Sequence, residues 1–199
     1  MKQRSITWAL GSISALCLML FSANSLVAST SEKKLMKVLY EFSGDSPASA
    51  WGTVNDGVMG GLSQGGATLG SEGMVFNGVL SLENNGGFSM AQSNVDLDLS
   101  EYKGIRLKVK GDGRTYQLRF ESDARLWGMW PVSFNREFET IPGEWAEVFI
   151  PFEGLNQSWR GRQLSDHTFN PDRIQQIAIL LGDKKEGPFN LEVAWIAAE

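Results

Sequence analysis

The glycine-rich segment at residues 51–63 carries the polar side chains that are best placed to bind a ligand. Its candidate binding residues are Asn55, Asp56, Gly57, Met59, Gly60 and Gly61. Glycine lets the backbone adopt positive φ and approach a ligand closely, and the amide and carboxylate can form hydrogen bonds with it. The alternative, which composition favours, is a turn across one end of a β-sandwich. A nucleotide-binding P-loop is excluded because no Lys-Ser/Thr pair follows the glycines.

Two further segments combine turn chemistry with amide or aromatic side chains. Residues 84–87 read Asn-Asn-Gly-Gly, which favours a hairpin turn, although the amides of Asn84 and Asn85 could also bind sugar hydroxyls. Trp127 and Trp130 flank a glycine in a predicted loop. Their rings suit stacking on a sugar or anchoring a protein partner, and they suit packing against a sheet edge equally well.

Trp159 and Arg160 form a fourth candidate pair. An arginine beside a tryptophan can bind a carboxylate partner or stack on an aromatic plane. Because the chain is acidic, a salt bridge within the fold is the favoured interpretation.

Groups for acid–base or metal chemistry are sparse. The single histidine, His167, lies in a Ser-Asp-His sequence, but no Gly-x-Ser-x-Gly motif supports a nucleophilic serine. Asp96 and Asp98 alternate on an extended segment, which suits solvated acids better than a calcium site or a glycosidase pair. We therefore predict no catalytic residues, no metal site and no cofactor, and expect a protein that is not an enzyme.

The composition of the 199 residues excludes several classes of protein. The net charge is −5, from 18 Lys and Arg against 23 Asp and Glu, which argues against binding to nucleic acid. One Cys excludes a disulfide scaffold and a cysteine-based zinc site. The 22 Gly and 7 Trp, with 42% hydrophobic residues, indicate a β-rich globular protein with many turns.

Residues 1–28 have the layout of a secretory signal peptide. Lys2 and Arg4 precede an apolar run at residues 8–21 and a small-residue region ending near Ala28. The run is shorter than the ~20 residues that span a bilayer, so we expect cleavage and export to the periplasm or cell exterior, with no membrane span afterwards. The alternative is an uncleaved N-terminal membrane anchor. Cleavage would remove the only cysteine, Cys17, and take the net charge to −7, because two basic residues and no acid are lost.

The rest of the chain has the period-2 hydrophobicity of β-strands. Apolar and polar residues alternate at 105–110 and at 116–121, and we predict that these runs form a hairpin around the Gly-Asp-Gly turn at 111–113. Residues 183–187 are likewise predicted to be a charged hairpin turn, and residues 174–181 a central strand covered on both faces. About ten strands and no long helical pattern predict an all-β sandwich or barrel, with one domain over residues 35–199.

Several segments together resemble the complex I intermediate-associated protein 30 family. The resemblance lies in Trp51 with residues 55–61, in 76–88, in 108–116, in Ile150-Pro151-Phe152, in Arg160-Gly161 and in 180–189. It implies a galactose-binding-like jelly-roll sandwich. It also implies an assembly-factor or chaperone role, because mitochondrial members help to build NADH:ubiquinone oxidoreductase. The export signal is a departure from those members, so the fold is expected to carry over and the complex I role is not.

Two functional hypotheses follow. The first is a non-enzymatic interaction or assembly protein whose partner is a subunit of a membrane or respiratory complex. The alternative is a carbohydrate- or small-ligand-binding jelly-roll module in the periplasm, with a glycan as partner.

Overall fold

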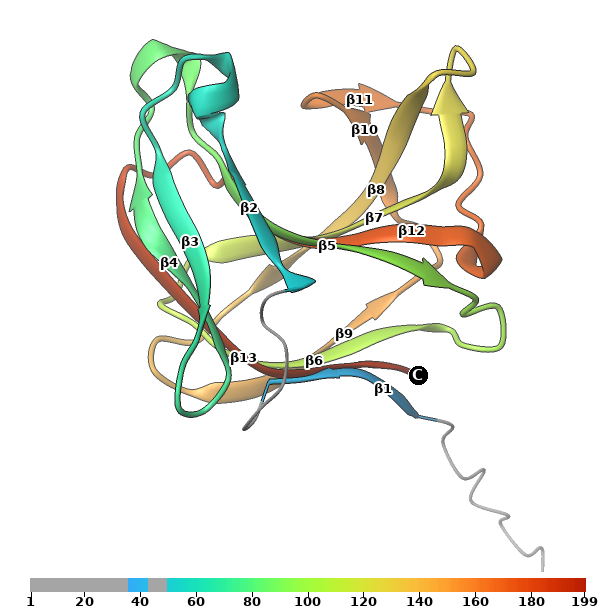
Figure 1. Ribbon diagram of the computed structural model, residues 1–199, viewed down its shortest axis with the longest axis horizontal. Coiled ribbons are helices and arrows are strands. Elements are labelled where there is room, and N and C mark those ends of the chain that lie inside the picture. The colour runs from blue at the N-terminus through green and yellow to red at the C-terminus, as the bar shows by residue number, and fades with distance from the viewer. Residues whose placement is uncertain (1–35, 43–49) are drawn as a thin grey trace, which may run out of the picture. The chain divides into compact units, whose positions relative to one another are not determined.

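The computed structural model describes residues 36–42 and 50–199, so the predicted signal peptide lies outside the described residues. Thirteen strands within these ranges form two antiparallel sheets (Figure 1). The six-stranded sheet has the order β3-β4-β13-β6-β9, with β1 also paired to β13; its strands are β1 (Lys37–Glu41), β3 (Gln64–Leu69), β4 (Met74–Leu80), β6 (Gly104–Lys110), β9 (Trp145–Pro151) and β13 (Gly187–Ala198).

The seven-stranded sheet has the order β11-β10-β8-β7-β12-β5-β2. Its strands are β2 (Gly52–Asn55), β5 (Ser89–Leu97), β7 (Thr115–Leu126), β8 (Trp130–Glu139), β10 (Asn156–Trp159), β11 (Arg162–Leu164) and β12 (Ile174–Leu181). Helical structure in the described ranges is limited to the 3-10 turns η2 (Asp56–Met59), η3 (Glu83–Asn85) and η4 (Pro171–Arg173). The all-β sandwich predicted from the sequence is confirmed.

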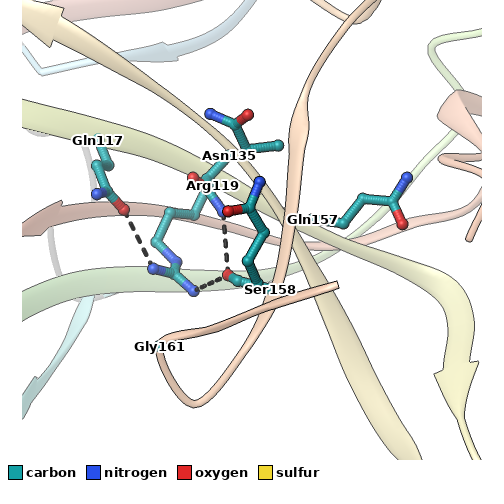
Figure 2. A pocket seen from close by; sticks show the side chains of 8 residues that line it. Gln117, Arg119, Asn135, Gln157, Ser158 and Gly161 are labelled. Atoms are coloured by element: carbon teal, nitrogen blue, oxygen red, sulfur yellow. Dashed lines mark hydrogen bonds between the residues drawn. The ribbon is translucent and has the colours of Figure 1, made fainter. Parts of the chain in front are cut away.

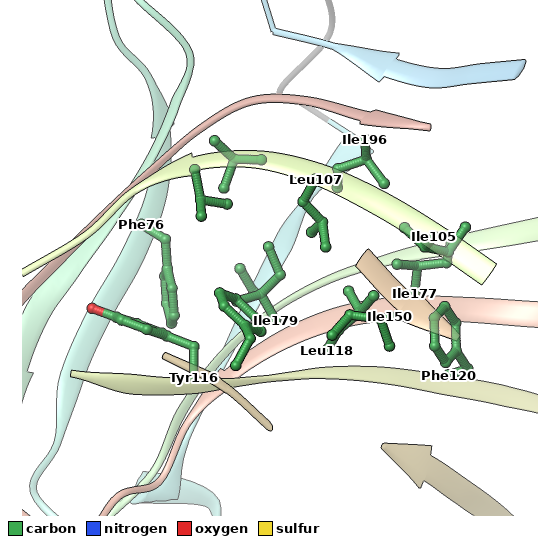
Figure 3. Packing of buried hydrophobic residues seen from close by; sticks show 14 of the residues in the cluster. Phe76, Ile105, Leu107, Tyr116, Leu118, Phe120, Ile150, Ile177, Ile179 and Ile196 are labelled. Carbon is green, nitrogen blue, oxygen red and sulfur yellow. The ribbon is translucent and has the colours of Figure 1, made fainter. Parts of the chain in front are cut away.

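The core lies between the two sheets. Leu107 and Ile196 of the six-stranded sheet point toward Leu118 and Ile179 of the seven-stranded sheet, and all four side chains are fully buried (Figure 3). Alternation along each strand places these residues inward and their neighbours outward. Burying a side chain of this size contributes about 1.5–3 kcal/mol, so the core is the main source of stability for the sandwich.

The predicted hairpin at 105–120 is wrong. Strand β6 pairs with β9 and β13 in the six-stranded sheet, whereas β7 pairs with β8 and β12 in the other sheet. The Gly-Asp-Gly segment therefore crosses from one sheet to the other. The alternating pattern shows that each strand has one buried face, and this is equally true of paired strands and of strands that face each other across a core.

The turns predicted at 84–87 and 183–187 are also crossings between the sheets and not hairpins. The first connects β4 to β5, and the second connects β12 to β13. Asn84 and Asn85 adopt positive φ of 55° and 59°, and Gly87 adopts 111°. The prediction of a turn at these residues was correct, but the prediction that the flanking strands pair as a hairpin was wrong. The third crossing at this end of the sandwich is the glycine-rich segment, which connects β2 to β3.

Strand β12 is central in its sheet, as predicted, but only one of its faces is covered by the other sheet. Ile177 and Ile179 are buried in the core. Gln176 and Leu180 lie on the opposite face and stay partly exposed. This outward face of the seven-stranded sheet carries one of the surfaces described next.

None of the helical segments in the described ranges is long and apolar enough to cross a membrane.

Candidate functional site

Asp56 is the structural centre of the glycine-rich loop. Its side chain is fully buried, and its carboxylate accepts hydrogen bonds from the Ser63 amide (2.9 Å), the Ser63 hydroxyl (2.5 Å), and the amides of Gly87 (2.6 Å) and Phe88 (3.3 Å). Burial raises the pKa of Asp56, but these hydrogen bonds outweigh it and lower the pKa below its ordinary value. Asp56 thus joins the crossing after β2 to the crossing before β5.

The neighbouring glycines are required by this arrangement. A Cβ atom on Gly61 would collide with the carboxyl group of Asp56, and one on Gly86 would meet the same carboxylate from the other side. Gly60 adopts a positive φ of 89° and ends η2. The glycines allow two backbone segments to close around one acidic side chain.

Of the other candidates in these loops, Asn55 and Asn84 form hydrogen bonds within the fold. The Asn55 amide donates to the Gly65 carbonyl and accepts from the Ser89 hydroxyl, at 3.1 and 2.6 Å. The Asn84 amide donates to the Gly60 carbonyl at 3.1 Å. Gly57, Met59, Gly60 and Asn85 are exposed.

Four apolar side chains on these connected loops are exposed, and we call them the loop patch. Val58 is 74% exposed, Met59 62% and Leu62 51%, and Leu82 follows at 37%. The hydrogen bonds of Asp56, together with those between Ser63 and residue 81, hold the backbone beneath them. Apolar side chains exposed on neighbouring loops make this end of the sandwich a candidate protein-binding surface.

Arg114 and Asp183 form an ion pair that was not predicted from the sequence, and their side chains are only 10% and 6% exposed. Arg114 donates from Nε and Nη2 to the two carboxylate oxygens, at 3.0 and 2.6 Å, and also to the carbonyls of Lys185 and Pro188. The bidentate bond raises the pKa of Arg114. Burial raises the pKa of Asp183, but the bonds to Arg114 outweigh it and lower the pKa overall. The charged segment at 183–187, predicted as a hairpin turn, thus supplies the acid of a buried ion pair.

The aromatic candidates form one cluster at the tips of two hairpins. The ring of Trp159 lies 5.8 Å from that of Trp127 and 6.2 Å from that of Trp130. The Arg160 guanidinium lies over Trp130 and Trp159, at 5.5 and 5.1 Å from the ring centroids. Trp127 is 72% exposed and Trp130 40%, whereas Trp159 packs partly against the core. The structure therefore brings together all four predicted residues, and Arg160 contacts aromatic rings.

In Figure 1 the connection after β2 and the β10–β11 hairpin rise on opposite sides, with β5, β12 and β7 between them. On the outward face of the same sheet, residues of β7, β8, β10 and β11 line a cavity of about 340 Å³. Every side chain that lines the cavity is polar, and Gly161 completes it; the lining includes Gln117, Arg119, Asn135, Asn156, Ser158 and Gln163.

Arg119 forms the centre of this polar cavity (Figure 2). Its guanidinium donates to the Ser133 hydroxyl (3.0 Å), the side-chain oxygen Oε1 of Gln117 (3.2 Å) and the Ser158 hydroxyl (3.4 Å). The Asn135 amide donates to the same Ser158 hydroxyl at 3.1 Å. Burial lowers the pKa of Arg119. The cavity around it was not predicted from the sequence.

The acid–base residues noted in the sequence are bonded locally. His167 Nδ1 lies 2.9 Å from the Ser165 carbonyl oxygen, and the Ser165 hydroxyl donates to Asp166. Asp98 accepts from the amide and hydroxyl of Ser100. Within the described ranges, no group of three or more His, Cys, Asp or Glu side chains could hold a metal ion.

The model of the complex I intermediate-associated protein 30 family matches residues 40–193. The chain belongs to this family. It is 32% identical over 97 residues to a probable complex I intermediate-associated protein 30 of Caenorhabditis elegans, a match that covers 48% of this chain and 28% of the relative. The mouse protein of the same name is 30% identical over 107 residues, covering 53% and 33%. These matches span about a third of the length of the mitochondrial relatives.

This family member also shares its fold with solved carbohydrate-binding proteins. The family 11 carbohydrate-binding module of the Clostridium thermocellum cellulase Lic26A-Cel5E superposes with a TM-score of 0.61 over 82% of this chain and 94% of the module. The sequences are 16% identical, so this likeness describes the β-sandwich alone.

Proposed function

We propose that this family member is a non-catalytic assembly domain that binds a polypeptide of a membrane or respiratory complex. The observation that carries the proposal is the loop patch. Its four apolar side chains project from backbone fixed by Asp56, so little conformational entropy is lost when a partner covers them. Membership of a family named for complex I assembly supports the same role.

The proposal includes export of the chain, with residues 1–28 removed as a signal peptide. Peptide mass mapping of the purified protein's N-terminus tests this part: a start near residue 29 supports export, and an intact Met1 contradicts it. A protein that begins near residue 29 would meet its partner on the outer side of the cytoplasmic membrane.

The binding role is tested by affinity capture from detergent-solubilised membranes of the source organism. The wild-type protein is expected to capture one defined membrane complex, and Met59→Asp is expected to lose most of it, since a charge is placed in an apolar contact. Ile141→Asp is the matched control, because Ile141 is 50% exposed and lies outside the loop patch. Equal capture by all three proteins would reject the loop patch as the binding surface.

The carbohydrate-binding alternative draws its hydrogen bonds from Asn55, Asp56 or Asn84, with Trp127 and Trp130 stacking on the sugar. Those three polar side chains instead form hydrogen bonds within the fold.

A further inference from the structure

We propose that the polar cavity around Arg119 is a binding site for an oligosaccharide. This inference goes beyond the assembly role and uses none of the loop patch residues. It starts from the composition of the cavity wall, which consists of amide, hydroxyl and guanidinium groups from β7, β8, β10 and β11. Amide groups donate and accept hydrogen bonds in one plane, which matches the vicinal hydroxyls of a sugar ring.

The central guanidinium is held in position before any ligand arrives. All three hydrogen bonds of Arg119 go to uncharged groups, and within the described residues no carboxylate lies within ion-pair distance of it. Its planar fork therefore keeps N–H groups for an oxygen-rich ligand. Because water is partly excluded around it, a hydrogen bond from this group is stronger than one at an open surface.

The shape of the surface favours a chain of sugars over a single ring. A second cavity of about 220 Å³ shares Gln117 with the first and continues past Glu137 and Thr115 toward Lys185. The two cavities form a polar track across β7 and β8. They offer no apolar pocket for a peptide side chain, and the acidic net charge of the protein disfavours a nucleic acid.

The test is titration calorimetry and native affinity electrophoresis of the purified protein with defined oligosaccharides. The probes are neutral gluco-, galacto- and manno-oligosaccharides, and oligogalacturonate. We expect saturable binding to at least one of them. Tightest binding to oligogalacturonate with strong salt dependence would assign a sugar carboxylate to Arg119, whereas salt-independent binding of a neutral probe would assign hydroxyls to it.

Three variants locate the site. Arg119→Ala is expected to weaken binding about tenfold or more, and Asn156→Ala about threefold. Asn156 is exposed, so Asn156→Ala should fold normally. It therefore tests the cavity even if Arg119→Ala, at a partly buried residue, fails to fold. Arg173→Ala, at an exposed arginine outside the cavity, is expected to leave binding unchanged. Gln163→Ala, at an exposed residue that lines the cavity, is expected to weaken it about threefold.

Absence of saturable binding to every probe would overturn the proposal, as would unchanged binding in Arg119→Ala, Asn156→Ala and Gln163→Ala. Met59→Asp separates this proposal from the assembly role. This variant is expected to bind the oligosaccharide with wild-type affinity. If it loses capture of the membrane complex but keeps sugar binding, the loop patch serves the assembly role and the cavity serves the sugar independently.

Discussion

The carboxylate of Asp56 accepts a hydrogen bond of 2.6 Å from the backbone amide of Gly87, 31 positions later in the chain. This bond ties the end of β2 to the start of β5 through the two crossings that join the sheets. A buried carboxylate that accepts several backbone hydrogen bonds is stable in its ionised form. The glycine-rich motif is thus explained by the acid it encloses.

Replacing Asp56 with Ala is expected to destabilise the fold by about 2–4 kcal/mol, because the buried amides of Ser63 and Gly87 lose their acceptor. Urea unfolding followed by tryptophan fluorescence measures this change. The control is Asp96→Ala, at an exposed acid in β5, which should stay within about 0.5 kcal/mol of wild type. Equal stability of the two variants would show that Asp56 is dispensable.

Stability is expected to fall in acid because the pKa values of Asp56 and Asp183 are both lowered in the folded state. The stabilisation that each carboxylate provides is fully present above its unfolded pKa of about 3.9, and is lost as the pH falls through the lower folded value. Urea midpoints measured from pH 7 to pH 2 should therefore drop below about pH 4. The acid limb should be shallower in Asp56→Asn, and an identical slope would contradict the assignment.

Gly61 and Gly57 provide a matched pair of substitutions in one loop. Gly61→Ala is expected to cost about 1–3 kcal/mol, since the new methyl group collides with the Asp56 carboxyl group. At Gly57 an added Cβ atom would meet open space, and the φ angle is not positive. Gly57→Ala should therefore be neutral or slightly stabilising. Thermal melting of both variants decides the point, and similar melting temperatures would be inconsistent with the close contact at Gly61.

Arg114→Ala is expected to destabilise the protein by about 3–5 kcal/mol, because it leaves the buried carboxylate of Asp183 without its cation. The double variant Arg114→Ala with Asp183→Ala should recover part of this loss, since no uncompensated charge remains. A double-mutant cycle in urea measures the coupling. Additive effects of the two single variants would mean that the pair does not act as a unit.

The fold class followed from the sequence because alternation at residues 105–110 and 116–121 is a local property of each strand. The pairing of strands did not follow, since β6 and β7 have the same alternation whether they share a sheet or face each other across the core. Strands β10 and β11 were missed for another reason. They are short and polar, and the pairing of β10 with β8 and of β11 with β10 stabilises them more than any preference of their own residues.

The sites show the same division between local and non-local information. The clustering of Trp127, Trp130 and Trp159 depends on two hairpin tips that meet in space, and the sequence contains only the aromatic residues. Arg119 looked like an ordinary outward residue of a strand. Its role appears only when Ser133 of β8 and Ser158 of β10 are placed beside it, 14 and 39 positions away.

Strand β13 at residues 187–198 lies inside the six-stranded sheet and pairs with β1, β4 and β6. During translation these three partners leave the ribosome long before β13 does, and none of them can complete its pairing until then. The six-stranded sheet is therefore completed only after β13 has been synthesised, whereas β3 with β4, β6 with β9 and the strands of the seven-stranded sheet can pair before then.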